Sequence, residues 1–173
     1  QQEPEIKLFA FDQDMEAINE AHHVLSGYNA TLIQANFRDL RTQLAFRKVK
    51  GIDGILFDLG VSSHQLDETE RGFSFDRDAK LDMRMNRESG ITAETIINEY
   101  SFEELKRIFK EYGEEQASGR IARAVERERE KHHISSTLEL AKIIESVVGV
   151  GSKESLKTKV RIFQALRICV NDE

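Results

Sequence analysis

Two carboxylates stand directly after short apolar runs, which is where α/β proteins usually place their chemistry. Asp58 follows the run Ile52–Phe57, and Asp12 follows the run Ile6–Phe11. Each run is predicted to be a strand. Ligands of open α/β sheets bind beyond the carboxyl ends of the strands, where an acid can hydrogen-bond ribose hydroxyls. Both acids are therefore candidate ligand-binding residues, although a solvated helix start explains the pattern at Asp12 equally well.

A long polar and aromatic loop follows Asp58 and places Arg71 beside Phe73 and Phe75. Loops of this length in compact domains usually have a function. A cation next to two aromatic rings suits a base that has been turned out of its stack. The same residues also suit an ordinary loop that two phenylalanines anchor in the core.

A second candidate surface is formed by Arg120, Arg123 and Arg127, whose spacing of three and four residues places them on one helix face. Such a stripe can bind the phosphates of a nucleic acid. Interleaved acids, among them Glu126 and Glu128, make a solvated, charge-balanced face an equally good interpretation.

Several other site classes are excluded by their residue patterns. Ser62, Ser63 and His64 are neighbours that cannot easily face one reacting atom, and the nucleophile-elbow pattern G-x-S-x-G is absent. His132 and His133 have no further ligands at metal-binding spacing. Neither G-x-G-x-x-G nor a Walker A pattern occurs in the sequence.

Strands and helices alternate in the first part of the chain, which predicts right-handed β-α-β units and a parallel sheet. The predicted strands are 6–11, 30–34 and 52–57, with helices at 15–25 and 40–49. Phe37 lies just after the second strand, where it can cover a ligand ring or, as we favour, seal the core. From Thr92 onward only helices are predicted. One begins at Ser101, and the others span 92–99, 114–130, 135–148 and 160–170. A flexible connection is predicted at 149–155.

The composition is that of a globular protein with a heavily charged surface. The chain has 173 residues, of which 39% are hydrophobic and 32% charged, and its net charge is −6. A general attraction to nucleic acid is therefore not expected, and any basic surface must be local. The single cysteine, Cys169, predicts a reducing, cytoplasmic compartment. No apolar run has membrane-spanning length, so no membrane association is expected.

Five segments together resemble the RsmH (MraW) family of S-adenosylmethionine-dependent 16S ribosomal RNA cytosine-N4 methyltransferases. They are FDLGVSSHQLD (57–67), RGFSF (71–75), LDMRM (81–85), YGEE (112–115) and FQALRICVNDE (163–173). The resemblance covers essentially the whole chain. It departs from the family pattern at His64, at Ala79–Lys80, at Asn86 and at 157–160.

The resemblance implies an α/β fold with a Rossmann-like class I methyltransferase sheet and an all-helical inserted domain. The implied divisions are 1–91 for the partial sheet domain, 92–156 for the insert and 157–173 for a helix that returns to the sheet domain. The sheet is expected to be incomplete. The family's first strand, with its glycine-rich cofactor loop, is expected before Gln1, and its last strands after Glu173.

The resemblance also assigns residue roles. Asp12 would hold the ribose of S-adenosylmethionine and Phe37 would flank its adenine, while Asp58 and Gln65 match the remaining cofactor contacts. Asp58 is in addition the candidate catalytic residue. The candidate RNA contacts are Ser62, Ser63, Arg71, Phe73, Phe75, Arg120 and Arg123. The implied partner is 16S ribosomal RNA in the small ribosomal subunit.

Three alternatives remain open from the sequence. The enzyme can act on another substrate, such as DNA cytosine or a small molecule. The chain can instead be a catalytically inactive RNA-binding or assembly module, because it contains no glycine-rich loop. The oligomeric state is also open, with a homodimer among the options.

Overall fold

The computed structural model describes residues 6–88 and 90–173, which divide into two compact units. The first, called here the strand unit, contains the described residues up to Asp58 together with Met85–Arg87. The second, the helical unit, contains Leu59–Arg84 and the described residues from Glu88 onward. Each unit is described by itself.

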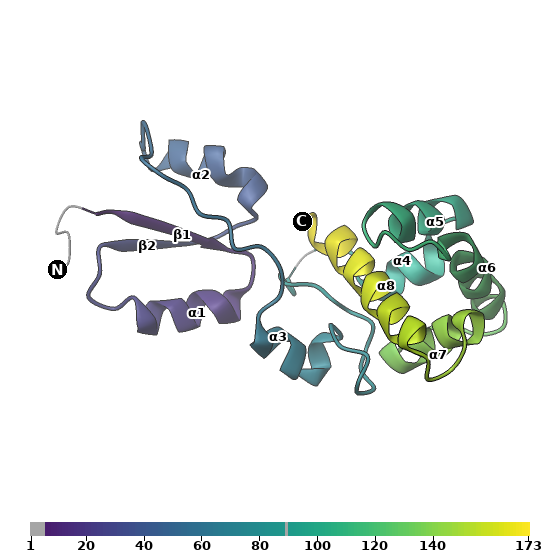
Figure 1. Ribbon diagram of the computed structural model, residues 1–173. Coiled ribbons are helices and arrows are strands. Elements are labelled where there is room, and N and C mark those ends of the chain that lie inside the picture. Colours follow the sequence, from purple (N-terminus) through teal and green to yellow (C-terminus); the bar gives the residue numbers. More distant parts are fainter. Residues whose placement is uncertain (1–5, 89) are drawn as a thin grey trace. The chain divides into compact units, whose positions relative to one another are not determined.

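The strand unit is built on a β-α-β arrangement, as the alternating pattern predicts. β1 (Leu8–Asp12) and β2 (Ala30–Gln34) pair in parallel, with Leu8 opposite Ala30 and Asp12 opposite Gln34. α1 (Met15–Val24) connects them, and it begins where the Asp14 side chain accepts the N–H of Glu16. Figure 1 shows α1 on one side of the two strands and α2 on the other.

Two short elements follow β2. The 3₁₀ helix η1 (Phe37–Asp39) is capped by Asn36, whose side chain accepts the N–H of Arg38. α2 (Leu40–Phe46) comes next and ends three residues before the predicted helix end. The helix stops because Lys48 adopts a left-handed conformation, with φ of 57°.

The prediction of a third strand at 52–57 is wrong, because this segment forms no strand and belongs to no sheet. Its apolar side chains are exposed, with Leu56 91% and Phe57 53% accessible to solvent. Periodicity identifies an apolar run that could form a strand, but a strand also needs a neighbour to accept and donate its backbone hydrogen bonds. In the described part of the chain, β1 and β2 pair only with each other.

The helical unit begins with two short elements, α3 (Ser63–Asp67) and η2 (Thr69–Arg71), and continues with five longer helices. These are α4 (Ala93–Glu99), α5 (Phe102–Glu111), α6 (Ser118–Arg129), α7 (Thr137–Val148) and α8 (Lys153–Asn171). The predicted helices are confirmed, with corrected ends. α6 begins four residues later than predicted. α8 begins seven residues earlier, capped by Ser152, so only the first part of 149–155 is a connection.

Serine caps explain where several of these helices begin. Ser62 with Gln65, Ser101 with Glu104, and Ser136 with Glu139 each form a capping box. In each box, the serine hydroxyl accepts a backbone N–H three residues later, and the later side chain accepts the serine's own N–H.

The core of the helical unit lies between α5, α6, α7 and α8 (Figure 1). Its fully buried side chains come from all four helices and include Phe109, Ile121, Leu140 and Ile162. Burying one such side chain contributes roughly 1.5–3 kcal/mol to folding. α6 and α8 each contact α4, α5 and α7, so these three helices pack against both of them.

The observed architecture is thus a mixed α/β chain with a parallel strand pair followed by helices. The finer prediction of a Rossmann-like sheet with an inserted domain, and the predicted domain boundaries, stay predictions. Within the described residues, none of the helices combines the length and the apolar character needed to cross a membrane.

Candidate functional site

The carboxyl ends of β1 and β2 lie next to each other and bring the first candidate residues together. Asp12 is opposite Gln34 in the register, and its carbonyl oxygen accepts the N–H of Ala35 at 2.9 Å. The Asp12 carboxylate accepts the N–H of Asp14 at 2.8 Å, which fixes its orientation at the start of α1. This is the position at which an acid can accept hydrogen bonds from ribose hydroxyls.

The electrostatic surroundings raise the pKa of Asp12 above its ordinary value. Desolvation by nearby protein atoms is the largest cause, and the negative charge of Asp14 adds to it, while the N–H groups of Asp14 and Gln13 act in the opposite direction. The residue as a whole is still exposed. A carboxylate that is partly desolvated but accessible is suited to exchange water for a hydroxyl ligand.

Aromatic side chains flank the carboxyl end of β2. Phe37, two residues beyond Ala35, is half-buried, and its ring centroid lies 6.0 Å from that of Phe57 in an edge-to-face arrangement. Asp58 follows Phe57 directly and is exposed. The Phe37–Phe57 contact therefore ties the segment that carries Asp58 to the end of β2, within the strand unit.

Phe57 has no predicted role at the site, although it is the last residue of the predicted strand and the first of the segment 57–67. Its ring contact with Phe37 is the observation that connects the two predicted cofactor residues Phe37 and Asp58. An aromatic residue immediately before the acid was the available signal. The cofactor-binding roles implied for Asp12, Phe37 and Asp58 stay predictions.

Gln65 and Ser62 have a structural role at the beginning of α3. The Gln65 side chain is 5% exposed, and its Oε1 accepts the Ser62 N–H at 3.0 Å, while Ser62 Oγ accepts the Gln65 N–H at 3.2 Å. The spacing S-x-x-Q is a capping-box pattern, which is the local sequence signal for this structural role. Ser62 and Ser63 are exposed, and the roles predicted for all three residues stay predictions.

The segment Arg71–Phe75 is anchored in the core of the helical unit. Arg71 and Phe73 are 3% and 6% exposed, and the ring of Phe75 lies 5.1 Å from that of Phe163 on α8. Gly72 has φ of 72°, and a Cβ at this position would overlap the carbonyl oxygen of Lys80. The arrangement matches the anchored-loop interpretation, and base binding by these residues stays a prediction.

Residues from three of the family-like segments, 71–75, 81–85 and 163–173, meet around Met83. The Met83 N–H donates to the carbonyl oxygen of Arg71 at 3.0 Å, and the Asn171 side chain donates to the Met83 carbonyl oxygen at 2.8 Å. A guanidinium N–H of Arg71 also donates to the carbonyl oxygen of Arg84 at 3.3 Å. Met83 is fully buried with φ of 62°, a conformation that persists only where surrounding contacts hold it.

The three arginines of the predicted stripe are exposed on α6, but they differ in the partners that their side chains contact. Arg123 stacks over the Phe102 ring at 4.0 Å and pairs with Glu126. Arg120 and Arg127 make no ion pair or side-chain hydrogen bond within the described residues. Arg123 is thus partly balanced by a neighbouring acid, whereas Arg120 and Arg127 remain open to an anionic ligand.

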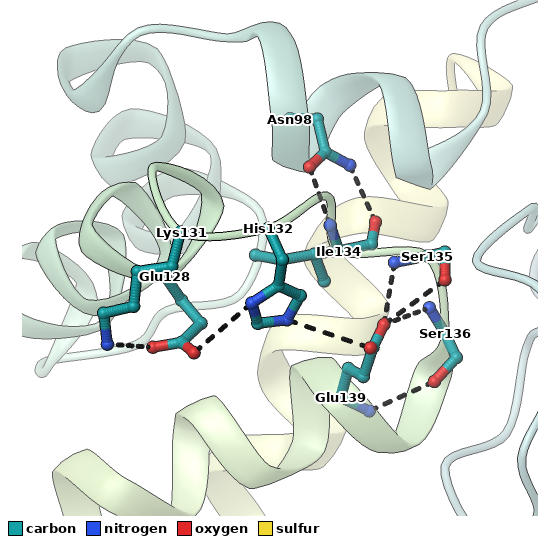
Figure 2. A network of polar contacts seen from close by, with 8 residues as sticks. All are labelled: Asn98, Glu128, Lys131, His132, Ile134, Ser135, Ser136 and Glu139. Carbon is teal, nitrogen blue, oxygen red and sulfur yellow. Dashed lines mark hydrogen bonds and ion pairs between the residues drawn. The ribbon is translucent and has the colours of Figure 1, made fainter.

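His132 belongs to a polar network that joins α4, α6 and α7 (Figure 2), and His133 pairs separately with Glu94 at 2.6 Å. His132 lies between Glu128 at 3.7 Å and Glu139 at 3.8 Å. The Asn98 side chain accepts the N–H of Ile134 at 3.0 Å and donates to its carbonyl oxygen at 2.7 Å. These contacts hold the α6–α7 connection in place.

The sequence was also compared with known protein families. It matches the family described as the MraW methylase family over residues 1–173. The match covers the carboxyl-end residues Asp12, Phe37 and Asp58 as well as the segments that meet at Met83. The chain therefore belongs to the MraW methylase family.

Proposed function

We propose that the protein transfers a methyl group from S-adenosylmethionine to the N4 amino group of a cytidine in 16S ribosomal RNA. The observation that carries the proposal is the family match over the whole chain. The arrangement at the carboxyl ends of β1 and β2 supports it, because an acid and an aromatic ring are brought to the edge where nucleotide ligands bind.

The residues at this edge fit the nucleoside part of the cofactor. Asp12 offers a carboxylate that is oriented by the Asp14 N–H and remains accessible, which suits the ribose hydroxyls. Phe37 offers a half-buried ring that suits the adenine. When bound, S-adenosylmethionine supplies an already activated methyl group, so the chain needs no nucleophile of its own.

The task of the protein is then placement and charge stabilisation. Holding two reactants in the reactive geometry can lower a barrier by roughly 7–11 kcal/mol. The N4 amino group is a poor nucleophile because its lone pair is delocalised into the cytosine ring. Asp58 would accept a hydrogen bond from this amino group and stabilise the positive charge that develops there.

The test replaces Asp58 by Ala and by Asn and measures transfer of radiolabelled methyl groups from S-adenosylmethionine to 16S RNA in small ribosomal subunits. We expect a loss of turnover of about 10²-fold or more, with cofactor affinity changed less. Near-normal turnover in both variants would remove Asp58 from the mechanism. Free DNA containing cytosine serves as the competing substrate, and preferential methylation of DNA would refute the RNA assignment.

Titration calorimetry with S-adenosylmethionine separates an enzyme from an inactive module. Binding by the unaltered chain and its loss in Asp12→Ala are expected. If the unaltered chain binds RNA but gives no heat with the cofactor, the chain is an RNA-binding module and the proposed catalysis is refuted.

A further inference from the structure

A strongly basic segment occupies part of the strand unit. Between residues 38 and 50 the only acid is Asp39. The basic residues are Arg38, Arg41, Arg47, Lys48 and Lys50. The whole chain has a net charge of −6 and this segment has a net charge of +4, so the remaining residues have a net charge of −10. A basic segment in an otherwise acidic chain is typical of a site that binds a polyanion.

Arg38 lies in η1 just before α2, Arg41 lies on α2, and the other three cations follow α2 in the chain. All five are exposed. Within the described residues, Arg41, Lys48 and Lys50 make no ion pair or side-chain hydrogen bond, so no acid neutralises them. Arg47 donates to the carbonyl oxygen and to Oε1 of Gln43, at 2.9 and 2.8 Å, and both partners are uncharged.

An aromatic residue directly precedes two of these cations in the chain. Phe46, the last residue of α2, is 77% exposed, whereas Leu40 and Leu44, four residues apart, are half-buried on another face. A phenylalanine this exposed next to unpaired cations offers a stacking surface for an unpaired base. Cationic grooves with stacking aromatics are the usual means of binding single-stranded nucleic acid.

The backbone at the end of α2 holds this arrangement. Lys48 has φ of 57°, and hydrogen bonds from the N–H groups of Lys48 and Val49 to the carbonyls of Ala45 and Leu44, at 2.9 and 3.0 Å, close the helix there. Glycine or asparagine normally occupies such a position. The lysine places a second cation directly after Arg47.

We propose that Arg41, Phe46, Arg47, Lys48 and Lys50 form an RNA-binding surface, called here the α2 basic surface. Its cations contact backbone phosphates and Phe46 stacks on an unpaired base. The choice of RNA rests on the proposed function. An anionic membrane fits less well, because a seven-residue helix with one exposed aromatic lacks the broad apolar face that interfacial helices bury.

The main test is the triple variant Arg41→Gln, Lys48→Asn, Lys50→Gln, in which Asn suits the left-handed backbone at position 48. Fluorescence anisotropy with a labelled single-stranded oligoribonucleotide is measured over a series of KCl concentrations. We expect binding at least tenfold weaker. The slope of log K against log [salt] should decrease in magnitude by about 2, since each lost phosphate contact contributes about 0.7.

A matched control removes the same charge from the helical unit. Lys142, Lys153 and Lys157 are exposed, and their combined replacement by Gln is expected to change RNA affinity less than twofold. Phe46→Ala is expected to weaken binding about fivefold or more with the salt slope unchanged, because stacking releases no counterions.

Equal RNA affinity of the triple and control variants would overturn the proposal. It would also be overturned if phosphatidylserine vesicles, but not RNA, distinguished the two variants. Methyl transfer to 16S RNA is measured separately. If the unaltered chain transfers no methyl group yet loses RNA binding in the triple variant, the α2 basic surface stands and the proposed function fails. If methyl transfer occurs but the triple variant binds RNA normally, only the surface is refuted.

Discussion

The Asn171 side chain donates a hydrogen bond of 2.8 Å to the carbonyl oxygen of Met83, a residue 88 positions earlier in the chain. A second bond, to the carbonyl oxygen of Arg167 at 2.9 Å, fixes the same amide near the end of α8. Asn171 is 5% exposed. This side chain therefore joins the last helix to the left-handed residue around which three family segments meet.

Replacing Asn171 by Ala should destabilise the helical unit. The Met83 carbonyl would lose its side-chain donor in a buried site, which costs roughly 1–3 kcal/mol. Urea denaturation followed by circular dichroism measures the change. Gln164→Ala, at an exposed position of α8, is the matched control and should change the free energy of unfolding by less than about 0.5 kcal/mol. Equal stability of both variants would contradict the role assigned to Asn171.

Replacing Gly113 by Ala should also destabilise the helical unit. A Cβ there would lie 2.6 Å from the carbonyl oxygen of Arg161 and 2.9 Å from that of Phe109, so α5 and α8 would have to separate. Overpacking of this kind costs about 1–3 kcal/mol.

Gly119→Ala is the control for Gly113, because a Cβ at position 119 would meet only the side chain of Lys106, at 3.9 Å. In α6 this change should be neutral or stabilising by up to about 1 kcal/mol. Thermal melts of the two variants should therefore shift in different directions, and a similar fall in Tm for both would contradict the close approach at Gly113.

Replacing Asp12 by Asn should raise Tm at neutral pH. Because desolvation raises the pKa of Asp12 in the folded state, the folded protein binds its proton more tightly than the unfolded chain does. The ionised carboxylate then opposes folding, and stability falls as pH rises from the unfolded pKa, near 3.8, through the raised folded pKa.

The stabilisation by Asp12→Asn should accordingly vanish below about pH 3.8 and reach its full value at neutral pH. Asn retains an acceptor for the Asp14 N–H, so the local hydrogen bond survives. Melts between pH 3 and 8 test this. A difference in Tm between the two proteins that does not depend on pH would contradict the desolvation of Asp12.

Replacing Glu139 by Gln should have the opposite pH dependence. The N–H groups of Ser135 and Ser136 lower the pKa of Glu139, and His132 contributes. A carboxylate with a lowered pKa stabilises the folded state above its unfolded pKa, near 4.5, and loses this contribution as pH falls through the folded pKa. Because the Glu139 side chain is 37% exposed, Glu139→Gln should lower the free energy of unfolding at pH 7 by no more than about 1 kcal/mol.

The fall in Tm caused by Glu139→Gln should become smaller in thermal melts recorded below pH 4.5. Glu111, an exposed residue at the end of α5 whose side chain makes no ion pair or hydrogen bond within the described residues, provides the comparison through Glu111→Gln. A larger Glu139→Gln effect at acidic than at neutral pH would contradict the lowered pKa.

The sequence by itself determined what depends on neighbouring residues. The capping box of Ser101 and Glu104, the Asp14 cap of α1 and the β-α-β order were all predictable, because helix starts and periodicities are set within a few positions of one another. The family, too, could be inferred from segments of four to eleven residues read one after another.

Only the tertiary structure decided what depends on distant partners. The run at 52–57 has strand-like residues, but in the described chain no neighbouring strand pairs with it. Phe73 carries a ring suited to stacking, yet it is buried in the helical unit. The meeting of Arg71, Met83 and Asn171 unites positions up to 100 residues apart. Spacing along the chain cannot encode these outcomes, because burial and pairing are fixed by which surfaces meet after folding.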